Sequence, residues 1–184
     1  MKITRLILSL LLLAAAGAQA ADPPALQAIP SLDVPRYMGR WYEIAKFPNR
    51  FQKQCIGDTT AEYQALEGQQ LRVINRCRKA GGTWDEAVGL ARQIGNPDSA
   101  KLKVRFAPSW LSFVPFVWGD YWVIDLDKDY QLVAVSEPKR EYLWVLSRTP
   151  EVAPEKYDAL LQRLRAMGLD TGKLETTQQA ADSR

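Results

Sequence analysis

The sequence predicts an all-β fold: an eight-stranded antiparallel up-and-down β-barrel with one C-terminal α-helix packed on its outside. Three observations lead to this prediction. Eight short stretches in which apolar and polar residues alternate follow one another between residues 40 and 148. Polar, glycine-containing or proline-containing turns separate the stretches, and no helical period lies between them. After residue 153 the apolar residues change to helical spacing.

The segment before the first strand is expected to hold a cleaved signal peptide and an extended lead-in. Residues 1–20 combine the basic Lys2 and Arg5 with a short apolar stretch and a cleavage site at Ala18-Gln19-Ala20. The apolar stretch is too short to span a bilayer, and an uncleaved membrane anchor is the alternative. No cysteine lies near the cleavage site. We therefore expect an exported chain, periplasmic or secreted, soluble and not a lipoprotein.

The remaining chain is expected to form one domain. Its lead-in covers residues 21–35, the domain residues 36–179 and a flexible tail residues 180–184. The strands are predicted at residues 40–47, 55–65, 71–78, 83–94, 101–106, 119–126, 131–137 and 142–148. The second and third strands flank a polar glycine-containing turn and predict a hairpin. Tight connections favour a closed barrel, because closure removes exposed sheet edges.

The end of the chain predicts a helix over residues 154–167. Its apolar side chains share one face, with proline near the start and Gly168 just past the end. We expect this face to pack against the outside of the barrel. Residues 174–179 are expected to add a short ninth strand.

The composition excludes several kinds of function. The chain contains no histidine, which rules out a Ser–His–Asp triad, a Cys–His pair and His-ligated zinc or haem. No G-x-S-x-G motif is present, and the candidate acid–base carboxylates Glu43, Asp58, Asp120 and Asp125 have no recognisable pairing. Hence no enzymatic activity, catalytic residue, metal or cofactor is expected.

The basic character of the chain comes mostly from its first residues. The formal net charge is +3, from 24 basic and 21 acidic side chains. Without Lys2 and Arg5 the basic side chains number 22, which leaves a net charge of about +1. This balance argues against nucleic acid as a partner.

Cys55 and Cys77 are the only cysteines in the sequence. In an exported chain they are expected to form one disulfide, which closes a loop of about 22 residues and is worth about 3 kcal/mol in the chain-entropy model. A reactive thiol is the alternative, since Lys53, Arg76 and Arg78 are neighbours that would lower a cysteine pKa.

Three segments, in order, resemble the motifs of the lipocalin family. Residues 39–45 (Gly-Arg-Trp-Tyr-Glu-Ile-Ala) are similar to the G-x-W-Y motif at the start of strand one. Residues 123–130 are similar to the turn motif between strands six and seven, with Leu126-Asp127-Lys128 in place of the usual Thr-Asp-Tyr. Residues 142–150 are similar to the third motif, with its arginine at the end of strand eight. Within the family, the likeness is to bacterial outer-membrane lipocalins and apolipoprotein D.

The resemblance implies structural roles for Gly39, Trp41, Asp127 and Arg148. Trp41 would plug the closed end of the barrel, and Arg148 would lie across its ring. Gly39 would let the chain turn into strand one without a side-chain clash. The resemblance also implies a carrier of a small hydrophobic ligand.

The open end of the barrel is expected to be the ligand entrance, because an eight-stranded barrel has room for one small ligand. Its loop over residues 107–118 is unusually apolar. This favours contact with an acyl chain or a membrane surface, and infolding that fills the barrel top is the alternative. Basic groups around the rim suit the anionic head of a fatty acid or lysophospholipid. The residues predicted to bind ligand at the mouth are Arg50, Phe51, Arg78, Trp110, Phe113, Phe116, Lys139 and Arg140.

Inward-facing side chains would line the ligand inside the barrel. The predicted lining is Glu43, Tyr63, Val73, Asn75, Trp84, Val104, Phe106 and Trp122. Alternation leaves the choice between Trp122 and Tyr121 open, because a bulge would invert it. Glu43 shares the parity of Trp41, so as a buried carboxylate it needs a partner: a tyrosine, Asn75 or a ligand head group.

Together these observations predict a non-enzymatic protein that binds and transports or stores a small hydrophobic or amphiphilic ligand in the bacterial periplasm. We expect a monomer or homodimer, with membrane-surface contact through residues 107–118. The alternatives are a lipid-modifying enzyme of the same fold and an interaction or inhibitor module that presents this loop to a protein.

Overall fold

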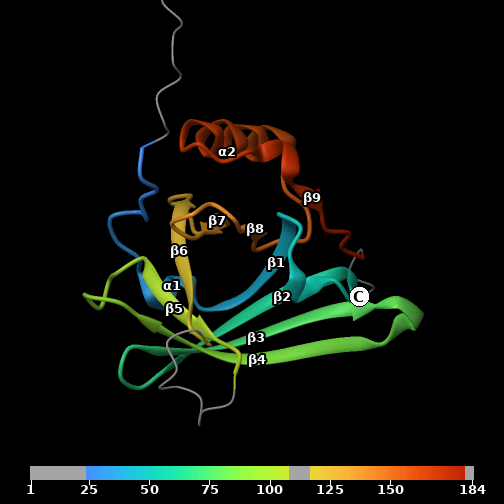
Figure 1. Ribbon diagram of the computed structural model, residues 1–184, viewed down its shortest axis with the longest axis horizontal. Coiled ribbons are helices and arrows are strands. Elements are labelled where there is room, and N and C mark those ends of the chain that lie inside the picture. Colours follow the sequence, from blue (N-terminus) through green and yellow to red (C-terminus); the bar gives the residue numbers. More distant parts are fainter. Residues whose placement is uncertain (1–23, 108–116, 181–184) are drawn as a thin grey trace, which may run out of the picture.

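Eight antiparallel strands close into a barrel in the computed structural model, which describes residues 24–107 and 117–180 (Figure 1). The strands are β1 (Gly39–Lys46), β2 (Cys55–Leu66), β3 (Gln70–Lys79), β4 (Trp84–Gln93), β5 (Lys101–Arg105), β6 (Gly119–Leu126), β7 (Leu132–Ser136) and β8 (Leu143–Ser147). Strands adjacent in sequence pair with each other, and β1 pairs with both β2 and β8, which closes the barrel. The predicted up-and-down barrel is confirmed.

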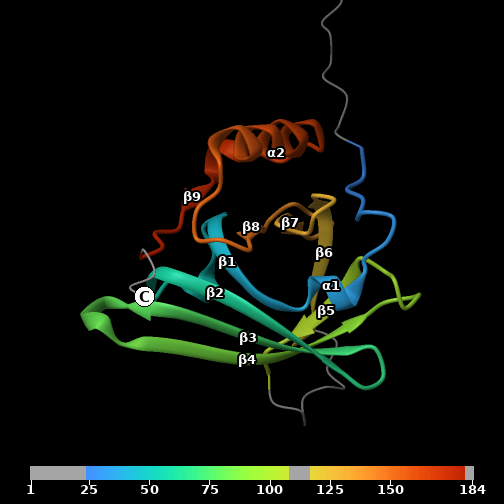
Figure 2. The ribbon, with the colours of Figure 1, turned by 180° about the vertical axis from the view of Figure 1, so that it is seen from behind.

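The wall of the barrel separates two hydrophobic cores, and the helix α2 (Pro154–Ala166) covers the outer one. One core fills the closed part of the barrel, around Trp41, Tyr63 and Val73. The other lies outside the barrel, where Leu160 and Leu164 of α2 are fully buried against outward-facing side chains of the strands. Figures 1 and 2 show α2 over the β7 and β8 side from opposite directions. The predicted position of the helix is therefore also confirmed.

A β-bulge in β1 lets this strand supply both cores. Glu43 pairs with Leu146, an interior residue, whereas Ala45 pairs with Val145, which lies beneath α2. The register shifts between Glu43 and Ala45, so the extra residue Ile44 inverts the faces of the strand. Trp41 and Ala45, which share the same parity in the sequence, thus face different cores.

The closed end of the barrel is built around Trp41. Its indole nitrogen donates to the carbonyl oxygen of Tyr37, which belongs to the short helix α1 (Val34–Tyr37). The guanidinium carbon of Arg148 lies 3.8 Å from the centre of the Trp41 ring. The Arg148 Nη1 and Nη2 atoms donate to the carbonyl oxygens of Arg40 and Arg36 at 2.8 and 2.7 Å. The aromatic plug and the backbone at the start of β1 are therefore held by one side chain.

The residues before β1 pack against the barrel more closely than a proline-rich lead-in suggests. Leu26 and Leu32 are buried, Leu26 in the core beneath α2 and Leu32 in the interior core. The amide nitrogen of Ile29 donates to the carbonyl oxygen of Val123 at 2.9 Å. Asp33 caps α1 by accepting from the Arg36 amide. The sequence pattern does not predict α1, because four residues are too few for a helical period.

The C-terminal segment closes a seam between β1 and β2. These strands pair only over residues 39–42 and 60–63, and they separate beyond that point. β9 (Glu175–Thr176) pairs with β1, and the Thr177 amide donates to the carbonyl oxygen of Ile44. The Gln179 amide group then donates to the carbonyl oxygens of both Glu43 and Thr59, at 2.7 and 2.9 Å. The segment therefore satisfies backbone groups on both strands of the seam.

Within the described residues, no helix has the length and apolar character needed to cross a membrane.

Candidate functional site

The inner faces of β2, β3 and β4 carry small residues toward the open end of the barrel. The register pairs Tyr63 with Val73 and Val73 with Gly89, which places them in one row. In the next row, Asn75 pairs with Ala61 and with Ala87, so two of its three side chains are alanines. Ala87 is exposed although it lies on the inner face. Small side chains fill little volume, and solvent reaches the inner face at Ala87.

Phe106 lies directly after β5 and covers Gly89 from the inner side. A Cβ atom at Gly89 would lie 2.7 Å from two carbons of the Phe106 ring and 2.8 Å from the Arg105 carbonyl oxygen. Glycine is therefore required beneath the ring. Phe106 is 43% exposed, and Val104, two residues earlier, packs against the interior core. An apolar ring thus faces the open interior.

Three tyrosines bond to one another at the opposite end of the interior. The Tyr121 hydroxyl oxygen lies 2.7 Å from the hydroxyl oxygens of both Tyr37 and Tyr63. Burial raises the pKa of Tyr63 to about 12 and raises the pKa values of Tyr37 and Tyr121 well above their usual value. All three hydroxyls therefore stay neutral at physiological pH and satisfy one another.

Glu43 is the buried carboxylate on the inner face of β1. It is 2% exposed and accepts hydrogen bonds from Gln52 Nε2 at 2.6 Å and Thr177 Oγ1 at 2.5 Å. Gln52 Oε1 accepts in turn from Trp144 Nε1 at 2.9 Å. Burial raises the pKa of Glu43, although these two donors and the Lys46 charge act in the opposite direction. The expectation that a tyrosine or Asn75 partners Glu43 was wrong: its partners come from the mouth loop and the C-terminal segment.

A column of aromatic rings leads from the mouth into the barrel. Phe51 belongs to the short helix η1 (Arg50–Gln52), and its ring lies 5.5 Å from that of Tyr142. The Tyr142 ring stacks 5.8 Å from that of Trp144, which packs against the interior core. The guanidinium carbon of Arg50 lies 5.1 Å from the centre of the exposed Phe51 ring. A cation and an apolar ring are therefore together at the rim.

The disulfide between Cys55 and Cys77 joins β2 and β3 near the same rim, as predicted. Both cysteines of the chain are described and both take part in it, so neither supplies a nucleophilic thiol. Asp85 pairs with Cys77 across the strands and accepts from Gln54 Nε2 at 2.9 Å. Its carboxylate lies 3.5 Å from Lys79 Nζ. The hydrogen bond from Gln54, followed by the charge of Lys79, lowers the pKa of Asp85.

Comparison with known proteins agrees with this geometry. A family model described as a lipocalin-like domain matches residues 32–179. The chain belongs to the lipocalin family. It is 40% identical over 156 residues to temperature-induced lipocalin-1 of Arabidopsis thaliana, covering 84% of this chain and 83% of that protein. It is 37% identical over 158 residues to the outer membrane lipoprotein Blc of Escherichia coli strain K12, covering 85% of each.

Two further likenesses extend beyond plants and bacteria. Apolipoprotein D of Mus musculus is 34% identical to this lipocalin over 157 residues, covering 82% of this chain and 78% of that protein. The solved structure of insecticyanin from Manduca sexta superposes with a TM-score of 0.65 at 20% identity, over 85% of both chains, and so supports the fold. Lipocalins typically bind small hydrophobic ligands and are generally not enzymes.

The lipocalin motif residues hold the closed end and one turn. Gly39 has a φ of +90°, and a Cβ atom there would lie 3.5 Å from Arg148 Nη1. Asp127 follows β6, and its Oδ1 accepts from the amides of Gln131 and Leu132, both at 2.6 Å. It thereby fixes the turn into β7. These contacts stabilise the fold. At the closed end of the barrel, Trp41 and Arg148 stabilise it through the ring contact and the backbone hydrogen bonds described above.

Two predicted lining residues of this lipocalin lie on the outer face. Trp84 pairs with Arg78, whereas the neighbouring pair Cys77 and Asp85 faces inward, so Trp84 points away from the interior and is 59% exposed. Trp122 packs in the core beneath α2 and carries Lys101 Nζ 4.3 Å above its ring. Tyr121 takes the inner position. Both errors arise because β4 and β6 carry large apolar residues on their outer faces.

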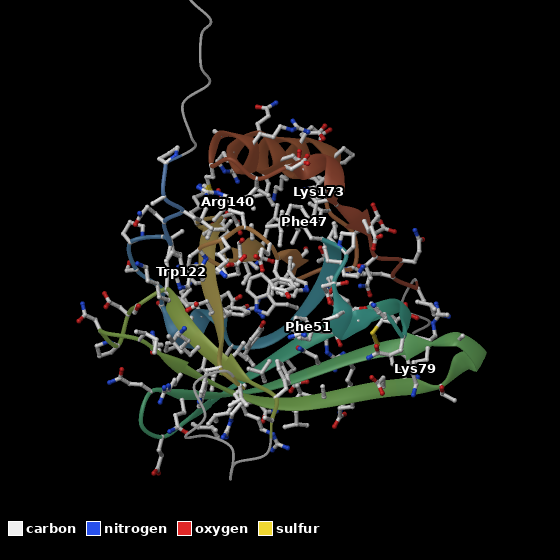
Figure 3. All side chains as sticks on the ribbon, in the orientation of Figure 1. Phe47, Phe51, Lys79, Trp122, Arg140 and Lys173 are labelled. Atoms are coloured by element: carbon white, nitrogen blue, oxygen red, sulfur yellow. A yellow bond between two sulfur atoms is a disulfide. The ribbon has the colours of Figure 1, made fainter. Side chains whose placement is uncertain are left out.

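The predicted basic rim of the lipocalin is smaller than expected. Arg78 faces outward and bonds Asp58 at 2.5 Å. Arg140 donates to the carbonyl oxygens of Met167 and Pro24, so it ties the β7–β8 turn to the end of α2 instead of facing a ligand. Figure 3 shows Arg140 close to α2, away from Phe51 and Lys79. Lys139 is exposed on the same turn. Arg50 and Phe51 lie at the mouth, and Trp110, Phe113 and Phe116 lie outside the described residues.

The sequence prediction missed three residues that shape this interior, Tyr37, Gln52 and Trp144, and it chose Trp122 over Tyr121. Tyr37 and Gln52 lie outside the strands, so alternation gives no signal for them. Tyr121 was one of two choices left open by alternation. Trp144 lies between Leu143 and Val145, which face outward into the core beneath α2, so Trp144 itself faces inward. The third motif pointed to this strand but not to its inner face.

Proposed function

We propose that this lipocalin is a non-enzymatic carrier that binds and transports or stores a fatty acid or lysophospholipid in the bacterial periplasm. The observation that carries the proposal is the open, small-residue inner face at Ala61, Ala87 and Gly89, covered by the partly exposed ring of Phe106. An acyl chain would pack well against such an apolar inner face of small residues.

The polar groups of the rim support an amphiphile over a fully apolar ligand. Arg50 beside Phe51, and Lys79 beside Asp85, place cations next to the entrance. A phosphate or carboxylate head group would gain charge-assisted hydrogen bonds there, while the neutral tyrosines receive the ligand's far end. Surface contact with a membrane through residues 107–118 remains part of the proposal.

The proposed periplasmic location rests on the N-terminal sequence and on similarity to an envelope protein. Residues 1–20 have the pattern of an export signal. The Escherichia coli relative is named as an outer membrane lipoprotein, which supports a role in the cell envelope.

Displacement of a fluorescent fatty acid from two matched variants tests the proposal. Ala87→Trp places a large ring on the inner face, and we expect it to weaken binding by about tenfold or more. Val88→Trp adds the same ring to the outer face of the same strand and should leave the affinity unchanged. Organic extraction of the purified protein followed by mass spectrometry should also yield a bound lipid. An empty extract together with no binding of the probe would sink the proposal.

A further inference from the structure

A second hollow lies over the outer face of the barrel and reaches Asp85 at the rim. It is a groove of about 550 Å³ over the outer faces of β1 to β4. Its floor includes Tyr42, Thr60, Arg76 and Glu86, and Trp84 lies beside them. The outer face of a barrel is convex, so a hollow there needs a wall. The C-terminal residues Gln179 and Ala180 supply it.

The strand register aligns the groove residues. Tyr42 pairs with Thr60, Thr60 with Arg76, and Arg76 with Glu86, which makes one row across four strands. Trp84 stands in the next row, opposite Arg78. The wall is fixed by hydrogen bonds, since the Ala180 amide donates to Asp58 Oδ1 at 2.5 Å and Gln179 holds the Thr59 carbonyl oxygen. The groove is therefore built from ordered parts of the barrel and of the seam.

The charges on this face cancel in pairs. Arg76 lies 2.6 Å from Glu86, and Arg78 lies 2.5 Å from Asp58. Arg40 lies 4.0 Å from Glu62 beside the groove. A paired face has no net field to attract a phosphate or a polyanion. It instead presents guanidinium donors next to carboxylate acceptors, which suits a neutral ligand with many hydroxyl groups.

Trp84 adds an exposed apolar surface to this polar row. An indole that is 59% exposed leaves a large flat face in water, which is unusual for the largest side chain. A hexose ring has one face of C–H groups, which pack on an aromatic ring, and a periphery of hydroxyls that donate and accept.

We propose that the outer groove binds a neutral hexose ring of a saccharide. The C–H face of the sugar would lie on Trp84, and its hydroxyls would bridge Arg76, Glu86 and Tyr42. A volume of about 550 Å³ is in the range of small-molecule sites. A second copy of the chain fits less well, because the centres of oligomer interfaces are depleted of charged residues and this row is centred on an ion pair.

Titration of the isotope-labelled full protein with glucose, N-acetylglucosamine and cellobiose tests the site by NMR. We expect the Trp84 indole signal, assigned by its loss in Trp84→Phe, and amides of β1 to β4 to shift with a Kd of about 1 mM. Trp84→Ala and Arg76→Met should each weaken this binding by about tenfold. Val88→Ala and Arg72→Met, on the same strands but outside the groove, should not.

Three outcomes would overturn the proposal. The first is no shift with any of the three sugars at about 50 mM. The second is an equal shift with sodium phosphate, which would mark an anion site. The third is Trp84-dependent self-association in analytical ultracentrifugation without a sugar response, which would mark a contact between copies. Ala87→Trp should bind sugar normally, so failure of the lipid proposal and failure of this one are distinguishable.

Discussion

At the scale of single residues, Glu43 joins parts of the chain that are distant in sequence. Its two carboxylate oxygens accept from Gln52 in the mouth helix and from Thr177 in the C-terminal segment. Its own carbonyl oxygen accepts from Gln179. One inward carboxylate therefore connects the seam to the loop that contains Gln52 at the open end of the barrel. Its burial makes the charged form costly, which has a measurable consequence.

We expect Glu43 to make stability fall as the pH rises. Because burial raises the folded-state pKa above the ordinary value of 4.5, the folded protein binds the proton more tightly than the unfolded chain does. This contribution is fully present below pH 4.5 and is lost as the pH rises through the folded-state pKa. The Glu43→Gln variant lacks this pH-dependent contribution to the free energy of unfolding.

Urea unfolding of both proteins from about pH 4 to pH 7 measures the effect. The free energy of unfolding of Glu43→Gln minus that of the parent should increase with pH, and groups common to both cancel. A constant difference, or one that decreases with pH, would contradict the raised pKa.

At the scale of elements, the seam between β1 and β2 depends on the C-terminal segment. The Gln179 side chain is the bridge, because it donates to one carbonyl oxygen on each strand. Removing this donor leaves the carbonyl oxygens of two buried residues, Glu43 and Thr59, without it, which costs about 1 kcal/mol.

Gln179→Ala is therefore expected to lower the free energy of unfolding by about 1 kcal/mol. Gln178→Ala is the control, since the Gln178 side chain is exposed and its structural contact comes from its backbone carbonyl. Chemical denaturation of the two variants gives the comparison. Equal stability would show that the seam does not need the bridge.

The positions of the strands and of α2 were predictable from the sequence, whereas the residues that face inward on several strands were not. In β3, large residues alternate cleanly, and Val73 and Asn75 lie on the inner face as expected. In β4, the large residues Trp84, Val88 and Leu90 lie outside and the inner positions hold Ala87, Gly89 and Ala91. A rule that sends large apolar residues inward fails where the interior is kept open. In β6 both faces are apolar, because α2 covers the outer one.

The site is less predictable than the fold because its residues meet only in three dimensions. The tyrosine triad draws on α1, β2 and β6, and Gln52 reaches Glu43 from a loop. Arg140 lies in the loop between β7 and β8, which the strand order predicts at the mouth. Its side chain instead donates to the backbone carbonyl oxygens of Met167 and Pro24, at the end of α2 and in the N-terminal segment. Alternation carries no information about such cross-element contacts.

At the scale of the whole molecule, closure of the barrel and the disulfide constrain the chain independently. The barrel is closed by the pairing of β1 with β2 and β8, while Cys55 and Cys77 are 22 residues apart in sequence. Reducing the disulfide is expected to lower the free energy of unfolding by about 3 kcal/mol and to leave the barrel folded.

Thermal and urea unfolding with and without a reductant measure this loss, and far-ultraviolet circular dichroism reports the barrel. The double variant Cys55→Ser with Cys77→Ser should be insensitive to reductant. An unchanged unfolding midpoint of the parent protein after complete reduction would refute the expectation.

The bulge at Ile44 couples the unfolding of the barrel to the unfolding of the helix α2. β1 places Trp41 in the interior core and Ala45 in the core beneath α2. A change in the pairing of this strand would therefore disturb both cores. Detaching α2 uncovers the same strand that carries the plug, and loosening the plug disturbs the surface on which α2 rests. The two cores therefore melt as a single cooperative unit, and amide protons in α2 and in β1 should exchange through the same global opening.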